Sequence, residues 1–64
     1  GPAPLGFEKD SGRLIEAGNY QRVVSVLDDV ASCETSKRQA ANDLDTSRRT
    51  IQRAIEERAD LYGL

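Results

Sequence analysis

Side chains that can donate several hydrogen bonds at once are concentrated in the second half of this 64-residue chain. The group consists of Arg48, Arg49, Gln52 and Arg53. A guanidinium group can donate two parallel hydrogen bonds to O6 and N7 of guanine, and a glutamine amide can pair with N6 and N7 of adenine. Guanidinium groups also bind phosphate oxygens. This residue chemistry suits recognition of a nucleic acid better than it suits a chemical reaction.

The composition removes most catalytic and metal-binding chemistry. The chain has no His and a single Cys, so a zinc site built from Cys and His is excluded by count. Adjacent acidic residues occur at 28–29 and 56–57, but neighbours on a helix point in different directions, and no histidine or glycine-rich phosphate loop accompanies them. We therefore expect no enzyme and no cofactor. Cys33 is expected to be a small buried side chain near a helix end.

The charge of the chain is unevenly distributed. The formal net charge is −2, which by itself argues against binding to nucleic acid. Residues 36–55, however, hold five basic and two acidic residues, whereas the rest of the chain carries a net charge of −5. Since the local potential within a Debye length decides whether a phosphate is attracted, a basic segment on an acidic body is what an oriented DNA reader needs. By charge alone, a solvated helix surface is the better explanation of these cations.

The first of two short helices is expected over residues 37–44. Ser36 and Gln39 have the capping-box spacing, in which each side chain satisfies a free backbone N–H of the other residue. Ala40 and Ala41 lie on one side of this helix, and their small size lets another helix approach closely.

A second helix is expected over residues 47–58, capped by Ser47 after an interruption at Asp45 and Thr46. The apolar side of this helix carries Ile51, Ala54, Ile55 and the stem of Arg58, and the opposite side carries Arg48, Arg49, Gln52, Arg53 and Glu56. This segregation would seat one side in a core and turn the long polar side chains outward.

The spacing of these residues resembles the helix-turn-helix of phage repressors, Cro-type proteins and winged-helix transcription regulators. The resemblance is carried by Ala41, Leu44, Ser47, Thr50-Ile51 and Ala54-Ile55. It covers roughly a third of the chain. Asp45 departs from the pattern, because the family usually has a glycine with positive φ at this turn position, and Asp tolerates that conformation at a cost of about 1 kcal/mol. Thr46 also replaces the commoner aliphatic turn residue.

The resemblance implies that the second helix lies in the major groove of double-stranded DNA. The residues it assigns to base reading are Ser47, Arg48, Arg49 and Gln52. The residues it assigns to phosphate contacts are Lys37, Arg38, Thr50 and Arg53. One such unit covers a few base pairs, so useful specificity implies a homodimer, tandem copies, or further domains beyond Leu64 such as a wing.

The remaining segments are expected to build the scaffold. Apolar residues at helical spacing predict a helix over residues 20–32 that supplies most of the core. A short helix is expected over residues 12–17, and residues 1–10 are expected to be a flexible arm or an expression remnant. The apolar end around Tyr62 leaves two alternatives open: it leads toward an absent wing, or it folds back onto the first helices.

Together these observations predict an all-α fold, a three-helix or four-helix bundle with a helix-turn-helix over residues 11–64. The expected function is sequence-specific DNA binding in a transcription regulator of repressor or winged-helix type, in the cytoplasm at the nucleoid. No membrane partner is expected, because no apolar run approaches about 18 residues. The alternative is a helical protein–protein interaction module of the same shape, with an exposed apolar patch made of Phe7, Leu61, Tyr62 and Leu64.

Overall fold

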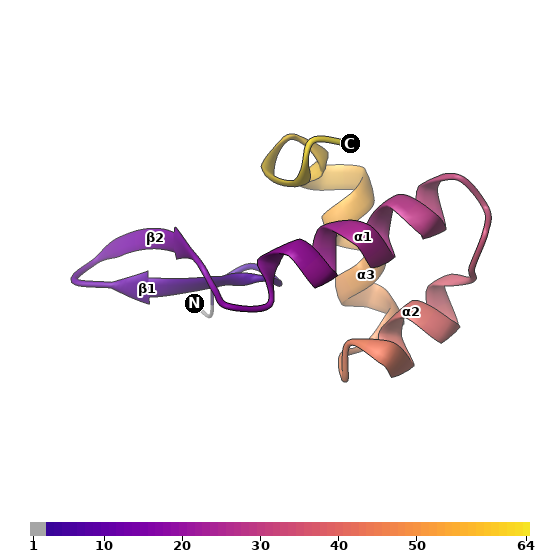
Figure 1. The fold of residues 1–64 in the computed structure, drawn as a ribbon, viewed down its shortest axis with the longest axis horizontal. Helices are drawn as coiled ribbons and strands as arrows, with labels where there is room; N and C mark the ends of the chain where they lie inside the picture. Colours follow the sequence, from indigo (N-terminus) through magenta and orange to yellow (C-terminus); the bar gives the residue numbers. More distant parts are fainter. Residues whose placement is uncertain (1–2) are drawn as a thin grey trace.

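Three α-helices and a two-stranded antiparallel sheet make up the described part of the computed structural model, residues 3–64 (Figure 1). In chain order the elements are β1 (Phe7–Asp10), β2 (Arg13–Glu16), α1 (Tyr20–Ala31), α2 (Lys37–Asp43), α3 (Arg48–Glu57) and a 3₁₀ helix, η1 (Ala59–Tyr62). The helices expected over residues 20–32, 37–44 and 47–58 are confirmed to within one residue at each end. Helical periodicity and serine caps were therefore sufficient signals for this part of the chain.

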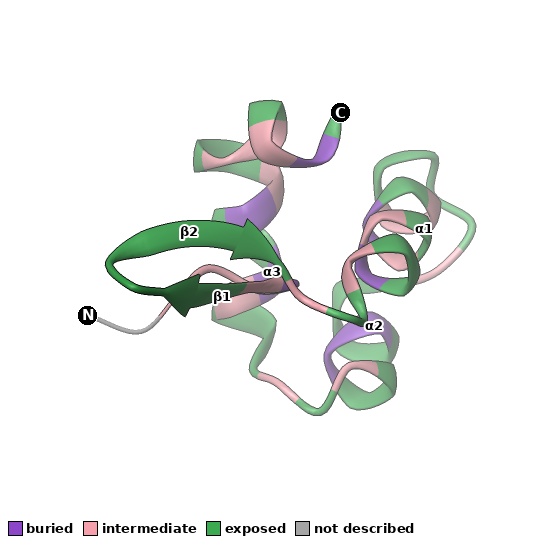
Figure 2. Ribbon diagram, turned by 60° about the vertical axis from the view of Figure 1, so that its left-hand side comes forward, coloured by how far each residue is buried: buried purple, intermediate pink, exposed green. Residues whose placement is uncertain are grey.

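The prediction of an all-α fold is wrong. Residues 12–17 do not form a helix: Arg13–Glu16 is the second strand of a β-hairpin whose first strand is Phe7–Asp10. The hairpin extends away from the helices, and most of its residues are exposed (Figures 1 and 2). The protein is thus a mixed α/β fold with the sheet attached at one end of α1.

The turn of the hairpin explains why the helix does not form. Asp10 and Arg13 face each other across a two-residue turn, and both turn residues have positive φ, 51° at Ser11 and 81° at Gly12. Two-residue hairpin turns of this kind match the right-handed twist of the strands and need residues that accept positive φ. Gly12 meets that need without a steric penalty, so the Ser11-Gly12 pair closes a hairpin.

The segment expected over residues 1–10 as a flexible arm contains an ordered strand. Phe7–Asp10 belongs to β1, and Leu5 and Phe7 pack against the core. The part of the prediction that falls on residues 1 and 2 lies outside the described residues.

The core lies where the three helices and η1 meet (Figure 2). The fully buried side chains Val23 and Leu27 of α1 contact the buried apolar sides of the other helices. Those sides consist of Ala40 and Ala41 on α2, Ile51 and Ala54 on α3, and Tyr62 on η1. The two alanines permit the close approach of α2 that their size predicted.

The carboxyl end folds back onto the first elements. Tyr62 is buried, and its hydroxyl donates to the carbonyl oxygen of Leu5 at 2.6 Å. The hydroxyl of Tyr20 donates to the carbonyl oxygen of Leu61 at 2.8 Å. The rings of Phe7, Tyr20 and Tyr62 lie with their centroids 5.2 to 6.3 Å apart, in the range of favourable aromatic pairs. The structure therefore shows the fold-back that the sequence left open for the apolar end of the chain.

Cys33 is exposed, so its predicted burial is wrong. It follows the end of α1 with a φ of 64°, and its N–H donates to the carbonyl oxygen of Val30. The backbone reversal that ends α1 therefore turns this side chain toward solvent. Among residues 3–64 no helix has the length and apolar character needed to cross a membrane.

Candidate functional site

A tight turn sets α3 against α2. Asp45 has a φ of 54°, the positive value that the helix-turn-helix resemblance implied. Its N–H donates to the carbonyl oxygen of Asn42, and the N–H of Thr46 donates to that of Ala41 at 2.9 Å. These two bonds are the pair that closes a helix end of the Schellman type, with Asp45 in the position that glycine usually takes. Asp45 therefore closes this helix end in the conformation that glycine usually adopts there.

Serine side chains fix the first turn of each helix. The Oγ of Ser36 accepts a hydrogen bond from the N–H of Gln39 at 3.0 Å, and the Oγ of Ser47 accepts one from the N–H of Thr50 at 3.1 Å. The reciprocal half of the predicted capping box is absent, because Gln39 donates instead to the carboxylate of Asp43, one turn further along α2. Both helix starts are nevertheless capped, so the residues that follow them are held in place.

The buried side of α3 determines which side chains face outward. Ile51 is fully buried and Ala54 is 2% exposed, so these residues anchor the helix in the core. Arg49, Gln52, Arg53 and Glu56 are all exposed. At 100° per residue they occupy the sector opposite Ile51 and Ala54, which makes this sector the outermost surface of α3.

Four cationic side chains gather where the amino-terminal turns of α2 and α3 approach each other. An open cleft there is lined by Ser36, Lys37, Arg38, Arg48, Arg49 and Gln52. A neighbouring hollow shares Ser36, Arg38 and Arg48 and extends toward Thr46. No acidic residue of the described chain lines either hollow. We call the first of these hollows the basic cleft.

The cations of the basic cleft are free to bind a ligand. Within residues 3–64 the side chains of Lys37, Arg38, Arg48 and Arg49 make no hydrogen bond or ion pair. All four residues are exposed. Like charges without partners repel one another, and an anion placed between them removes that repulsion. The cleft is therefore suited to hold phosphate groups.

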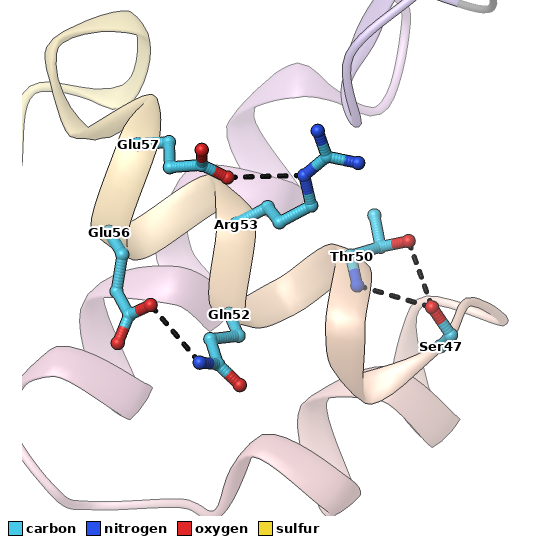
Figure 3. A network of polar contacts seen from close by, with 6 residues as sticks. All are labelled: Ser47, Thr50, Gln52, Arg53, Glu56 and Glu57. Atoms are coloured by element: carbon cyan, nitrogen blue, oxygen red, sulfur yellow. Dashed lines mark hydrogen bonds and ion pairs between the residues drawn. The ribbon is translucent and has the colours of Figure 1, made fainter.

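The other residues predicted for the site already have partners (Figure 3). The Ser47 hydroxyl is bonded to both the N–H and the hydroxyl of Thr50, so both side chains serve the cap. Gln52 donates through Nε2 to Glu56, and Arg53 pairs through Nε with Glu57, each at 3.1 Å. The structure thus brings Lys37, Arg38, Arg48, Arg49 and Gln52 together at the basic cleft. Ser47 and Thr50 lie at the start of α3 as capping residues, and Arg53 lies further along its outer side.

Arg22 has a role that sequence reasoning missed. Its Nη2 donates to the carbonyl oxygen of Asp43, the last residue of α2, at 3.1 Å. A cation at a helix carboxyl end is favourable because the unpaired carbonyl groups there carry partial negative charge. The bond joins residues 21 positions apart, so no local pattern could reveal it. It ties α1 to the helix that carries Lys37 and Arg38.

The part of the chain that the structure describes has no group of three or more His, Cys, Asp or Glu residues placed to hold a metal ion. Compared with known proteins, the chain has no significant match to a family model, a curated protein or a solved structure.

Proposed function

We propose that this protein binds double-stranded DNA through α3, as the DNA-binding domain of a transcription regulator of the helix-turn-helix kind. The observation that carries this proposal is the basic cleft: four exposed cations without partners among the described residues, at the crossing of two capped helices. A solvated helix surface has no need to collect cations from two helices around one hollow. A polyanion with regularly spaced phosphates matches such an arrangement.

Base reading is assigned to Arg48, Arg49 and Gln52. Arg49 and Gln52 lie in the outer sector of α3, and Arg48 lies at the edge that faces α2. Each bidentate contact to the correct base contributes about 1–3 kcal/mol of discrimination. Ser47, included among the base readers in the sequence-based prediction, is better described as the cap that holds the first turn of α3.

Phosphate contacts are assigned to Lys37, Arg38 and Arg53. They lie on both sides of the base-reading residues along the α2–α3 surface, which is where the two strands of a duplex would pass. Thr50 can donate its O–H to a phosphate while its oxygen remains bonded to Ser47, because the Ser47 hydroxyl can be the donor of that bond. These contacts add affinity without sequence information.

The protein–protein alternative loses the surface on which it depended. Tyr62 is 3% exposed, and Phe7 and Leu61 pack against the core, so three members of the proposed apolar patch do not form an open surface. Leu64, at 39% exposure, is a single apolar side chain, and single exposed apolar residues are ordinary on a protein surface.

The proposal is tested by fluorescence anisotropy with a labelled duplex at about 50 and about 200 mM salt. If three phosphates are neutralised, the binding constant falls about 40-fold over this range. The double variant Arg48→Ala, Arg49→Ala should weaken binding by about 30-fold or more, because two contacts of at least about 1 kcal/mol each are lost.

The matched control removes two cations from the hairpin, which extends away from the helices (Figure 1). Lys9 and Arg13 are both exposed there, and the Lys9→Ala, Arg13→Ala variant should bind within about two-fold of the unmodified protein. Circular dichroism verifies that both variants are folded. Binding that does not depend on salt, or equal losses in the two double variants, would refute the proposal.

A further inference from the structure

The outer side of α3 changes character along its length. Its first turn carries the arginines of the basic cleft, whereas its last turn carries Glu56 and Glu57. A shallow hollow on this side is lined by Arg49, Gln52, Arg53, Glu56 and Glu57. Two carboxylates on a surface that must approach phosphates oppose affinity, so the function proposed above requires a reason for their presence.

Glu56 favours one orientation of the Gln52 amide. The Nε2 of Gln52 donates to a carboxylate oxygen of Glu56 at 3.1 Å (Figure 3). A carboxylate can only accept hydrogen bonds, so a 180° rotation of the amide would place Oε1 against Glu56, oxygen against oxygen. The bond therefore favours one order of donor and acceptor at the tip of Gln52 before any ligand arrives.

The order of donor and acceptor that Glu56 favours at the tip of Gln52 is compatible with adenine. The amide uses one N–H for Glu56 and retains a second N–H together with Oε1. The bidentate contact to adenine needs one donor for N7 and one acceptor for the N6 amino group. Gln52 can therefore bind Glu56 and adenine simultaneously, in the orientation that Glu56 favours.

The charge of Glu56 acts in the same direction. Non-specific DNA binding comes almost entirely from phosphate contacts, and a carboxylate within a Debye length of the backbone weakens those contacts. Specific binding recovers the loss through the oriented Gln52. Glu57 holds Arg53 by the analogous bond, 3.1 Å from Nε to Oε2, which leaves the Nη groups available for a phosphate.

From this geometry we infer that Glu56 is a positioning residue for sequence discrimination: it presents Gln52 to an A·T base pair and disfavours binding to unrelated sequences. The inference rests on the proposed DNA binding. It adds that Glu56, an acidic residue on a surface that otherwise offers cations to DNA, contributes to the selection of the sequence.

The test starts from a duplex selected by the unmodified protein from a randomised pool. Binding constants are then measured for that duplex, for every single base-pair change and for a scrambled sequence. The proteins compared are the unmodified chain, Glu56→Gln, Gln52→Ala and the variant with both changes. Glutamine at position 56 keeps the size of the side chain but can donate as well as accept, so it no longer favours one orientation of Gln52.

Glu56→Gln should lower the discrimination at one A·T pair by about two-fold, because an exposed hydrogen bond between side chains four residues apart on a helix orients Gln52 only to that extent. It should also tighten binding to the scrambled duplex several-fold. Gln52→Ala should remove the preference at the same pair, and adding Glu56→Gln to it should cause no further loss there. The control Glu8→Gln removes an exposed carboxylate from the hairpin and should change neither quantity.

The possible outcomes separate this inference from the function on which it rests. If the unmodified protein shows no salt-dependent DNA binding, both fail. If it binds DNA but Glu56→Gln keeps every base preference, or if the protein has no base preference at all, the role of Glu56 is refuted and DNA binding stands. A uniform loss at all positions together with a lower melting temperature would assign Glu56 to helix stability instead, which also refutes the inference.

Discussion

Replacing Tyr62 by Phe tests how the carboxyl end closes the fold. The change keeps the buried ring and its neighbours Phe7 and Tyr20 but deletes the hydroxyl that donates to the carbonyl oxygen of Leu5 at 2.6 Å. A net hydrogen bond contributes about 1 kcal/mol, and a partly buried carbonyl left without a partner adds to the loss. We expect the free energy of unfolding to fall by about 1–2 kcal/mol. For a chain of this size, each kcal/mol lowers the melting temperature by about 4–8 °C.

The same substitution should change the pH dependence of stability. Burial raises the pKa of Tyr62 above its usual value of 10.0, and the repulsion between the Tyr62 and Tyr20 phenolates adds to the rise, while Arg58 opposes it. Above about pH 10 the unfolded chain releases this proton while the folded chain retains it, so the unfolded state binds fewer protons and stability falls as pH rises. One proton contributes at most about 1.4 kcal/mol per pH unit. At pH values below the pKa of Tyr62 in the unfolded chain, the contribution of its retained proton to the free energy of unfolding is fully present.

Urea unfolding between about pH 8 and about pH 11 measures both effects. The unmodified protein should lose stability more steeply than Tyr62→Phe at the alkaline end, so the difference between the two should shrink there. Deprotonation of the other groups affects both proteins and cancels in the comparison. Equal stability at pH 8 would refute the role of the hydroxyl, and parallel curves up to pH 11 would refute the raised pKa.

Two further substitutions test the backbone geometry. Asp45→Gly should raise the free energy of unfolding by about 0.5–1 kcal/mol, because it relieves the strain of a φ of 54°. Asp45→Asn removes the charge but also tolerates this conformation, so it should change stability less. Thermal unfolding measures both variants, and a destabilised Gly variant would contradict the argument. Gly6→Ala and Gly12→Ala each place an alanine at a φ of 81°. The added Cβ would lie 3.2 Å from the Cβ of Val23 at position 6, but it would have no atom within 4 Å at position 12. Gly12→Ala should therefore cost about 1 kcal/mol and Gly6→Ala about 1–3 kcal/mol more, and equal losses would show that space at Val23 is not limiting.

The helices could be predicted because their signals are local. The apolar residues of α1 recur at helical spacing, and Ser36 and Ser47 each precede a helix that they cap. The positive φ at Asp45 was implied by the helix-turn-helix resemblance, and Asp is one of the few residues other than glycine that accept it. The partners of the outward side chains were harder to foresee, because Gln39 can satisfy either the cap or Asp43, and the structure has the latter.

The hairpin was missed because its apolar pattern does not alternate. Leu14 and Ile15 are adjacent, which suggests one side of a short helix, but in β2 they point to opposite faces of a sheet that has no layer packed on it. They are 45% and 38% exposed, so burial did not shape this part of the sequence. The informative signal was the Ser11-Gly12 turn, which closes a hairpin irrespective of what the strands bury.

The hydrogen bonds that close the fold lie near one end of α3, and the basic cleft lies at the other end. The ten residues of this helix span about 15 Å. Tyr62 follows its carboxyl end, whereas Arg48 and Arg49 occupy its first turn. Hydrogen bonds from Tyr20 and Tyr62 hold η1 against α1 and Leu5 without using any side chain of the cleft. Stability and ligand binding should therefore vary independently: Tyr62→Phe should leave the affinity of the folded protein for a duplex unchanged, and Arg48→Ala, Arg49→Ala should leave the melting temperature nearly unchanged. A large effect of either substitution on the other property would show that the two ends of α3 are coupled, and the separation argued here would fail.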